Sequence, residues 1–561
     1  MKSLLLLSLV LPAAAAVLLM LLRARLQRGT ARWIALGATI ATLALVLGLA
    51  DDFRELPAIN SIRVQTGALD GGALAESPVR PRFEFRNEWL TLGAANDARS
   101  FRLEMRFGLD GVSLALVVLT AVLTTSCVLG SWESIRERDV EFYACLLLLE
   151  CGLIGVFCAF DLVLFYVFFE FTLIPLFFLI GIWGGPQRRY AAIKFFLYTF
   201  VGSMVTLVGL VAVVLSAYSA GLSTPCSIPD LAAWLTRRPL SAQAQTWLFL
   251  AISTGFMIKV PLFPVHTWLP LAHVEAPTAG SVLLAGVLLK LGTYGFFRLC
   301  LPLFPTACQT VGLPLIAGLA VVGIVYGSLC ALAQRDIKKL VAYSSVAHLG
   351  FCMLGLFALN AEGISGAVLQ MINHGLSTGG LFLLVGMIYD RYHTRQMDEL
   401  HGLASRLPLL TCAMVFICMA SIGLPGLNGF VGEILSLAGM FKRQPVYAVI
   451  GASGIVLGAW YLLTMLQHVF FGPPPERSHP GEPDRDLNAR ELLAVLPICA
   501  LCLWIGVRPQ PLLETIKPDV NAIAALYADG SETSAIAGRE TKMSNIATTP
   551  LANASPSNDS Q

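Results

Sequence analysis

The chain has 561 residues, of which 56% are hydrophobic and only 13% are charged. Soluble globular proteins carry about 25% charged residues, so this composition excludes an ordinary soluble domain. The formal net charge of +2 gives no indication of nucleic-acid binding.

Apolar runs long enough to cross a membrane recur from one end of the chain to the other. A transmembrane helix needs about 20 apolar residues. The first run, 3–22, is followed rather than preceded by arginines, which predicts a span and not a signal peptide. We predict an all-α integral membrane protein with about fourteen transmembrane helices, at 3–22, 33–50, 108–130, 140–159, 161–183, 191–217, 246–269, 278–300, 309–333, 338–358, 364–389, 408–440, 446–470 and 490–507.

Lysine and arginine are unevenly distributed over the short loops. Because the loops rich in these residues stay on the cytoplasmic side, both termini and loop 51–107 are predicted to lie on the other side. The number of spans and the lack of a mitochondrial targeting segment favour a multi-pass protein of a bacterial inner membrane. The opposite loops hold only Arg237, Arg238, Arg298, Lys442 and Arg443, whereas the positive set holds Arg23, Arg25, Arg28, Arg32, Arg136, Arg138, Arg188, Arg189, Lys194, Arg335, Lys338, Lys339, Arg391, Arg395, Arg406, Arg477, Arg485 and Arg490.

Proline and glycine predict broken helices in spans 7, 8 and 12. Span 7 contains Pro261 and Pro264, span 8 follows Pro277 and is rich in glycine, and span 12 contains Gly-Leu-Pro-Gly at 423–426. Freed backbone groups are tolerated in a membrane only where they line a protein-buried or wet cavity. Spans 4–8 and 9–13 resemble two inverted five-helix repeats with the broken helix fourth in each, which points to a transport site near the midplane.

These elements divide the chain into predicted parts. They are the first two spans with the external loop (1–107), the third span with a cytoplasmic loop (108–139), the first repeat (140–300), the second repeat (301–470), a loop with the last span (471–510), and a flexible polar tail (511–561).

Ionisable side chains lie in the middle of several predicted spans. An isolated charge at the bilayer centre costs roughly 3 kcal/mol, so each one needs a reason. Histidine suits a proton relay because it exchanges protons near neutral pH. The candidates are Glu150 in span 4, Glu170 in span 5, Lys259 and His266 at the break in span 7, Lys290 in span 8, His348 in span 10, His374 in span 11 and Glu433 in span 12.

A lysine in apolar surroundings holds its proton less tightly, and a nearby glutamate reverses this effect. A Glu–Lys pair that separates is therefore a switch of proton affinity. Movement of Glu170 away from Lys259 would release a proton toward Lys290 and the histidines, and Glu433 would deliver it to the far side.

Simpler interpretations remain open for each candidate. They are a static Glu170–Lys259 ion pair, hydrogen-bonded core histidines at His348 and His374, loop or helix-end roles for His266 and His273, and a Glu150 that only contacts a polar neighbour such as Lys194.

The sequence contains no phosphate-binding loop, no dinucleotide-binding fingerprint, no iron–sulfur cysteine cluster and no haem attachment motif. The 13 cysteines, including Cys499 and Cys502, lie mostly in apolar runs and are interpreted as small lipid-compatible side chains. We therefore expect the chain to be driven by an ion gradient or by a partner subunit.

Several segments resemble the antiporter-like subunits of proton-pumping NADH:quinone oxidoreductase, respiratory complex I. The resemblance covers about residues 100 to 507 and rests on GLDGVSLAL (108–116), FFEFTLIPLFFLIGIWGG (168–185), KVPLFPVHTWLPLAHVEAPTAGSVLLAGVLLK (259–290), RDIKKLVAYSSVAHLG (335–350) and GLPGLNGFVGE (423–433). The 259–290 segment is specific for a superfamily that also contains Mrp-type cation/proton antiporters and membrane-bound hydrogenases. Within it, the EFTLIP motif at 170–175, Trp183-Gly184 and Glu433 in place of a lysine resemble the M-type subunits.

The resemblance implies roles for individual residues. Glu170 and Lys259 would form the switch pair, Lys290 the central relay, His348 the connecting axis and Glu433 the terminal proton site. His266 and His374 match family positions with less certain roles.

The resemblance also implies the partners. NADH, FMN, iron–sulfur clusters and quinone would bind in other subunits, so no cofactor or metal is expected in this chain. Its partners would be the other membrane subunits, including sister antiporter-like subunits, together with membrane lipid. The alternatives are a subunit of a Mrp-type cation/proton antiporter, a passive scaffold within the same complex, and a solute carrier.

Overall fold

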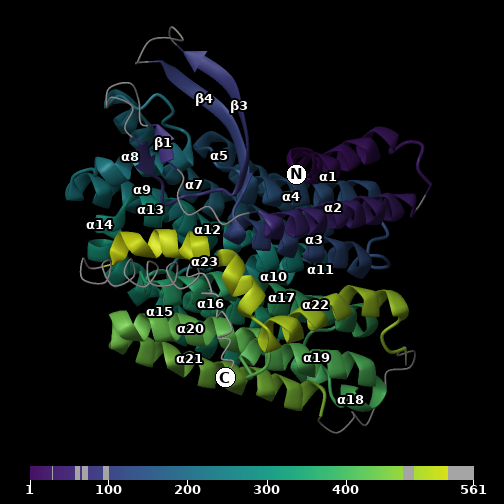
Figure 1. Ribbon diagram of the computed structural model, residues 1–561. Coiled ribbons are helices and arrows are strands. Elements are labelled where there is room, and N and C mark those ends of the chain that lie inside the picture. Colours follow the sequence, from purple (N-terminus) through teal and green to yellow (C-terminus); the bar gives the residue numbers. More distant parts are fainter. Residues whose placement is uncertain (28, 57–62, 66–73, 93–99, 472–484, 529–561) are drawn as a thin grey trace, which may run out of the picture.

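The computed structural model describes residues 1–27, 29–56, 63–65, 74–92, 100–471 and 485–528. Most helices run side by side through the width of the molecule (Figure 1). In these described ranges, twelve helices are long and apolar enough to cross a membrane. They are α1 (Lys2–Leu22), α2 (Thr30–Glu55), α3 (Gly111–Gly130), α4 (Asp139–Cys158), α5 (Leu162–Phe171) with α6 (Leu173–Trp183), α7 (Arg188–Ser219), the Thr278–Leu303 helix, the Pro305–Leu332 helix, α16 (Ile337–Leu356), α17 (Ala361–Tyr392), α21 (Pro445–Val469) and α22 (Ala489–Val507).

The two remaining predicted spans, span 7 and span 12, are each divided into two shorter helices. Span 7 consists of α9 (Ala242–Lys259) and α10 (Trp268–Glu275), and span 12 of α19 (Pro408–Ile422) and α20 (Asn428–Arg443). Pro261 has no N–H to donate to the carbonyl of Met257, and Leu262 N donates to it instead, at 3.0 Å. In span 12, Gly423 and Gly426 have φ values of 83° and 91°, which glycine adopts without strain. The total of fourteen spans and the inverted repeats remain predictions.

The prediction of a break in span 8 is wrong. The Thr278–Leu303 helix is continuous and contains two π-helical segments, η2 (Leu284–Leu288) and η3 (Phe296–Cys300). Its glycines serve close packing instead: a Cβ on Gly286 would meet Leu123 Cδ1 at 2.4 Å, and one on Gly292 would meet Val260 Cγ2 at 2.6 Å. Pro277 precedes the first turn, where its missing N–H costs no helical hydrogen bond.

Span 5 is kinked where α5 passes into α6. Pro175 cannot donate a hydrogen bond to the carbonyl of Phe171, and the helix is irregular at Thr172. Thr172 Oγ1 donates to the Phe169 carbonyl at 2.9 Å. The irregularity lies beside Glu170, one of the predicted site residues.

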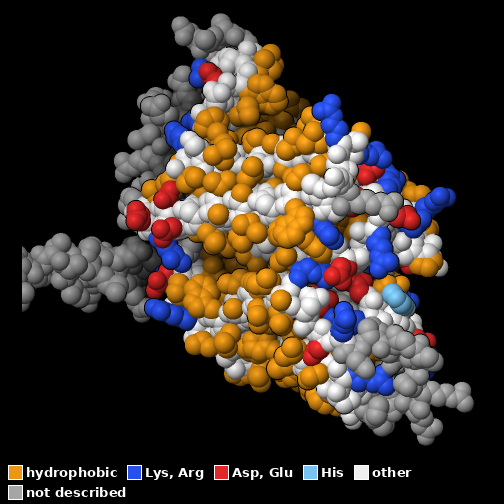
Figure 2. All heavy atoms as spheres, turned by 90° about the vertical axis from the view of Figure 1, so that its right-hand side faces the viewer, with side chains coloured by type: hydrophobic (Ala, Val, Ile, Leu, Met, Phe, Trp, Pro, Cys, Tyr) orange, Lys and Arg blue, Asp and Glu red, His pale blue; other side chains and the backbone are white. Residues whose placement is uncertain are grey.

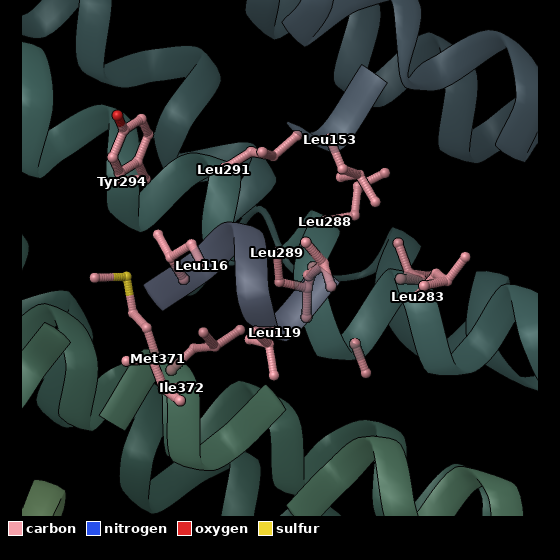
Figure 3. Packing of buried hydrophobic residues seen from close by; sticks show 14 of the residues in the cluster. Leu116, Leu119, Leu153, Leu283, Leu288, Leu289, Leu291, Tyr294, Met371 and Ile372 are labelled. Atoms are coloured by element: carbon pink, nitrogen blue, oxygen red, sulfur yellow. The ribbon is translucent and has the colours of Figure 1, made fainter. Parts of the chain in front are cut away.

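The most deeply buried helices form the centre of the bundle. The Thr278–Leu303 helix and α17 are buried along their spanning windows, and α4 and α16 are nearly so. Leucines of α3 and of the Thr278–Leu303 helix pack against Met371 and Ile372 of α17 (Figure 3). Helices α1, α2, α21 and α22 are mostly exposed at the periphery. Four of the predicted ionisable residues, Glu150, Lys290, His348 and His374, lie in the central helices.

The surface agrees with a membrane location. On the face in Figure 2, hydrophobic side chains cover the middle, and lysine, arginine, aspartate and glutamate gather toward the two ends. Large apolar side chains are exposed on the peripheral helices, such as Trp33 of α2 and Trp460 of α21. Such a surface suits lipid or neighbouring membrane subunits better than water.

The predicted external loop 51–107 contains strands, although part of it lies outside the described residues. Strands β1 (Arg63–Gln65) and β2 (Leu74–Glu76) pair with each other, and β3 (Phe83–Leu92) pairs with β4 (Phe101–Leu109) as an antiparallel hairpin with Phe85 opposite Phe107. The hairpin projects from the helical body (Figure 1). Arg106 of β4 fixes the base of the hairpin through two ion pairs. One is to Glu84 at 2.8 Å, and the other is to Asp230 of α8 (Ile228–Arg237) at 3.0 Å.

The first part of the predicted flexible tail, 511–561, is helical. Residues 510–524 form helix α23 (Gln510–Ala524), followed by η6 (Ala525–Tyr527), and Ile516, Val520 and Ile523 of α23 are buried. Isoleucine and valine at this spacing form one apolar face of a helix. The prediction missed this face because it rested on the polar composition of the segment as a whole. The segment after 528 lies outside the described residues.

Helix α23 docks on the first turn of α3 through a glycine. Gly111 N donates to Asp519 Oδ2 at 2.7 Å, and a Cβ on Gly111 would meet Thr515 O at 2.0 Å. Beneath this contact, Asp110 forms an ion pair with the buried guanidinium of Arg298. Any side chain at position 111 would push α23 away from this cluster.

We expect Gly111→Ala to weaken the docking of α23 by about 1–3 kcal/mol, the usual cost of overpacking. A protease that cleaves after glutamate should then cut the solubilised protein faster at Glu514, which is exposed on α23. Gly48→Ala on α2 is the control, because its Cβ would meet nothing within 4 Å. Equal cleavage rates in the two variants would contradict the tight contact.

Candidate functional site

Lys290 lies at the centre of the bundle, directly after a π-helical segment. A π-helix changes the i→i−4 pattern of hydrogen bonding and often marks a functional position. Lys290 Nζ donates a hydrogen bond to the carbonyl oxygen of Ala285 at 2.5 Å. The second polar contact of Lys290 Nζ is His374 Nδ1 on α17, at 2.6 Å. Lys290 is wholly buried, so these two groups replace its hydration shell.

His374 faces a second histidine across the interface of α16 and α17. The ring centroids of His374 and His348 are 5.8 Å apart, and the rings are inclined by 50°. His374 Nε2 is buried and has no hydrogen-bond partner among the described residues. Because unpartnered buried nitrogens are costly, a water molecule is the natural partner at this position.

Glu433 lies next to His348, just after the break in span 12. Its Oε1 lies 2.9 Å from His348 Nδ1 and accepts a hydrogen bond from Gln370 Nε2, also at 2.9 Å. Glu433 follows the first turn of α20, which the break at 423–427 turns back into the bundle. The other nitrogen of His348 lies 3.4 Å from the hydroxyl of the buried Tyr461 on α21. Both ring nitrogens of His348 thus have polar neighbours.

Four of the predicted residues therefore form one polar line through buried helices. It runs from Lys290 through His374 and His348 to Glu433, and two of its three steps are direct contacts. The sequence predicted the residues of this line but not their order. The structure places His374, rather than His348, beside Lys290.

Glu170 and Lys259 lie at two helix irregularities and act on each other electrostatically. Lys259 is buried at the last residue of α9, and its Nζ lies 4.3 Å from the centroid of the Phe169 ring. Lys259 Nζ donates to no described residue. Glu170 is half-buried and interacts with Ser203 of α7. The pair is thus close enough to interact but is not locked by a hydrogen bond.

Apolar packing separates Lys259 from the line that begins at Lys290. Gly292 of α12 (Lys290–Gly295) lies against Val260 and the Phe256 carbonyl, and the Phe256 ring contacts Phe296 with centroids 5.8 Å apart. No hydrogen bond between described residues connects the two lysines. An effect of Lys259 on Lys290 would therefore have to act through its charge, or through water that enters this packing.

Two predicted residues lie outside the line. Both carboxylate oxygens of Glu150 are buried without a hydrogen-bond partner among the described residues, and Lys194 lies instead 5.9 Å from the centroid of the Tyr190 ring. His266, at the break in span 7, packs between Phe263 and Tyr326 at centroid distances of 5.7 and 5.4 Å. Neither residue contacts Lys290 or Glu433 through a hydrogen bond that the described atoms make.

The residues of the line are suited to proton transfer. Within the described part of the chain, no group of three or more histidine, cysteine, aspartate and glutamate side chains is arranged to hold a metal ion. The line consists instead of one base after another, each able to take and give a proton.

Comparisons with known proteins identify the family of the chain. Residues 159–458 match the family described as NADH:quinone oxidoreductase/Mrp antiporter, transmembrane region. The chain is 41% identical over 533 residues to NADH-quinone oxidoreductase subunit M of Rhodobacter capsulatus, covering 92% of this chain and 95% of that protein. It is 44% identical over 420 residues to the subunit M of Rickettsia prowazekii strain Madrid E, covering 74% and 83%.

Its fold matches a chain of respiratory complex I from Thermus thermophilus with bound NADH, with a TM-score of 0.77. The sequence identity is 31%, and the match covers 94% of this chain and 100% of that chain. The chain belongs to the NADH:quinone oxidoreductase/Mrp antiporter family. The resemblance seen in the sequence is confirmed.

Sequence reasoning missed several polar residues of this family member. Gln370 and Tyr461 carry no signal of their own, because polar residues of the same types occur throughout the chain. Arg298 was counted as a loop residue, although it lies in the Thr278–Leu303 helix and is 1% exposed. The available signal was that Arg298 lies inside predicted span 278–300 and Asp110 inside predicted span 108–130.

We expect His374→Phe to destabilise the subunit by about 1–3 kcal/mol, because Lys290 would lose one of its two acceptors in a buried site. His374→Gln offers a new acceptor and should restore most of this loss. The measurement is the temperature at which the detergent-solubilised protein loses its native gel band. His468→Phe on the exposed part of α21 is the control, and equal midpoints for His374→Phe and the control would contradict the contact.

Proposed function

We propose that this chain is the M-type proton-translocating membrane subunit of a NADH:quinone oxidoreductase. In this role it moves protons across the membrane, coupled to electron transfer from NADH to quinone in other subunits. The observation that carries the proposal is the polar line Lys290–His374–His348–Glu433 through the buried helices. The high identity to subunits named M along most of the chain supports the choice of complex.

A proton can pass along this line by changes of hydrogen-bonding partner. His374 Nδ1 lies beside the Lys290 ammonium, so the ring can accept a proton there and release one from Nε2. A bridging water would carry it to His348, whose Nδ1 lies beside Glu433. Imidazole suits both steps because its two nitrogens exchange roles as the proton enters and leaves.

Glu170 and Lys259 supply the switch in this proposal. A carboxylate near Lys259 favours its charged form, and withdrawal of that carboxylate removes the support. Neither side chain is held by a hydrogen bond to the other, so a modest movement at the Thr172 kink would change their separation. The positive charge on Lys259 would then rise or fall and alter the proton affinity of Lys290 by charge repulsion.

The subunit would take no part in the redox chemistry itself. NADH, FMN, iron–sulfur clusters and quinone would bind in partner subunits, as the lack of any such motif in the sequence supports. The proposed partners are the other membrane subunits, including sister antiporter-like subunits. The proposed location is a bacterial inner membrane. The uneven charge of the loops supports an orientation with both termini on the non-cytoplasmic side.

We expect Lys259→Ala to lower proton pumping by about tenfold or more, because loss of a unit charge about 10 Å from Lys290 changes the proton affinity of Lys290 by about that factor. The measurement is the acidification of sealed inverted membrane vesicles per NADH oxidised, with the amount of assembled complex determined by native gel. Glu170→Gln should act in the same direction.

Lys442→Ala is the matched control, because Lys442 is exposed and pairs only with the exposed Glu362 among the described residues. Normal pumping by Lys259→Ala in fully assembled complex would leave a passive scaffold as the better interpretation. Pumping that required sodium ions and persisted without NADH oxidation would favour the Mrp-type cation/proton antiporter.

A further inference from the structure

The ammonium of Lys259 lies against an aromatic ring rather than against a hydrogen-bond acceptor. We propose that Phe169 is a positioning residue of the switch, whose ring face holds the charged ammonium of Lys259 while Glu170 is withdrawn. This inference rests on the proposed function. It adds the group that keeps Lys259 charged when its carboxylate partner has moved away.

The contact between Lys259 and Phe169 is shielded from water. Lys259 is 1% exposed, and its Nζ donates to no described residue. Nζ lies 4.3 Å from the centroid of the Phe169 ring, within the range of about 6 Å in which a ring face attracts a cation. This attraction is strongest where water is excluded, and Phe169 is also 1% exposed. The ring face therefore partly replaces the hydration that the ammonium has lost.

Neighbouring aromatic side chains fix the plane of the Phe169 ring. Phe165, one turn earlier on α5, stacks on it with centroids 5.9 Å apart and planes inclined by 19°. The ring of Phe256 on α9 meets it edge-on, with centroids 5.8 Å apart and planes inclined by 80°. These two contacts leave the Phe169 ring little freedom to turn away from Lys259.

Phe169 and Glu170 are consecutive residues of α5, so their side chains point about 100° apart around the helix. The ring contacts Lys259, whereas Glu170 is half-buried, interacts with Ser203 and leaves its Oε1 without a partner among the described residues. A rotation of α5 at the Thr172 kink would bring one of the two side chains toward Lys259 as it moves the other away. The structure thus shows the arrangement in which the ring holds the ammonium.

The ring changes what withdrawal of Glu170 does to the switch. A lysine in an apolar site tends to lose its proton when its carboxylate partner leaves, and a neutral Lys259 would exert no charge on Lys290. When the ring face supports the ammonium, withdrawal of the carboxylate instead turns a neutral pair into a single positive charge. This charge repels the proton on Lys290 and favours its transfer to His374.

A ring face also differs from a carboxylate in the chemistry it allows. It attracts a cation but has no lone pair that could take the proton. Phe169 can therefore keep the ammonium in place without entering the proton path. The apolar packing around Phe256 and Phe296 separates this site from Lys290.

The experiment uses the intact complex in sealed inverted membrane vesicles. Protons pumped per NADH oxidised are measured, and assembly is checked by native gel. Phe169→Leu keeps an apolar side chain but removes the ring face. Phe249→Leu on α9 is the matched control, because Phe249 is also wholly buried and its ring meets Phe357 and no cation in the part of the chain that the structure describes.

A second pair of variants carries 3,4,5-trifluorophenylalanine in place of Phe169 or of Phe249. Fluorine withdraws electron density from the ring face and so weakens its attraction for a cation, while the size and apolar character of the ring are nearly kept. A role in packing alone would not respond to this change.

We expect Phe169→Leu to lower pumping about fivefold or more, because a cation–ring contact shielded from water is worth at least about this factor. Phe249→Leu should pump close to the wild-type level. Trifluorination should lower pumping at position 169 and leave it unchanged at position 249.

Equal pumping by the two members of either pair overturns the role of the ring, and it leaves the proposed function intact as long as Lys259→Ala is impaired. Normal pumping by Lys259→Ala in assembled complex overturns both. If Phe169→Leu fails to assemble, the trifluorinated pair decides alone, because it alters the charge distribution of the ring and not the packing.

Discussion

The cost of holding a charge away from water governs the interior of this subunit. A lysine or carboxylate at the centre of a bilayer is expensive unless another polar group replaces its hydration. Arg298 meets this cost with Asp110 and the Tyr294 hydroxyl, in a cluster that can remain fixed. For Lys290, a backbone carbonyl and a histidine offset this cost, and the histidine can itself carry a proton. The difference separates a structural charge from one suited to transport.

Several ionisable residues of the candidate site lie at irregularities in the helices. Lys290 follows π-helix η2, Lys259 ends α9 before the proline break, Glu433 lies in α20 just after the break in span 12, and Glu170 lies beside the Thr172 kink. Each irregularity frees or redirects backbone groups that a regular helix would use internally. Polar side chains and water can therefore gather at these points without exposing unsatisfied backbone to lipid.

The sequence was sufficient to predict the helical membrane fold, the breaks in spans 7 and 12, and the ionisable residues of the central line. These features follow from local patterns of apolar runs, prolines and isolated charges. The break expected in span 8 was wrong, because glycines such as Gly292 can serve close helix packing as well as interruption. The partners Gln370 and Tyr461 could not be predicted, since the contacts of Gln370 with Glu433 and of Tyr461 with His348 join residues that are distant in sequence. The docking of α23 on Gly111 has the same long-range origin.

In the proposed function, the groups that act in proton transfer are separated in two places, once within the line and once between the line and Lys259, and these separations fit a pump better than a continuous wire would. An unbroken conductor across the bilayer would let protons flow back. The proposal needs a water molecule for the step between His374 and His348, and apolar packing separates Lys259 from Lys290. A charge still acts across such packing: two unit charges about 10 Å apart at an effective dielectric constant of about 20 interact by about 1.7 kcal/mol. That energy changes a proton affinity by more than about tenfold. In the proposed function, Lys259 would thus control Lys290 without exchanging a proton with it, which would keep the controlling event separate from the conducting one.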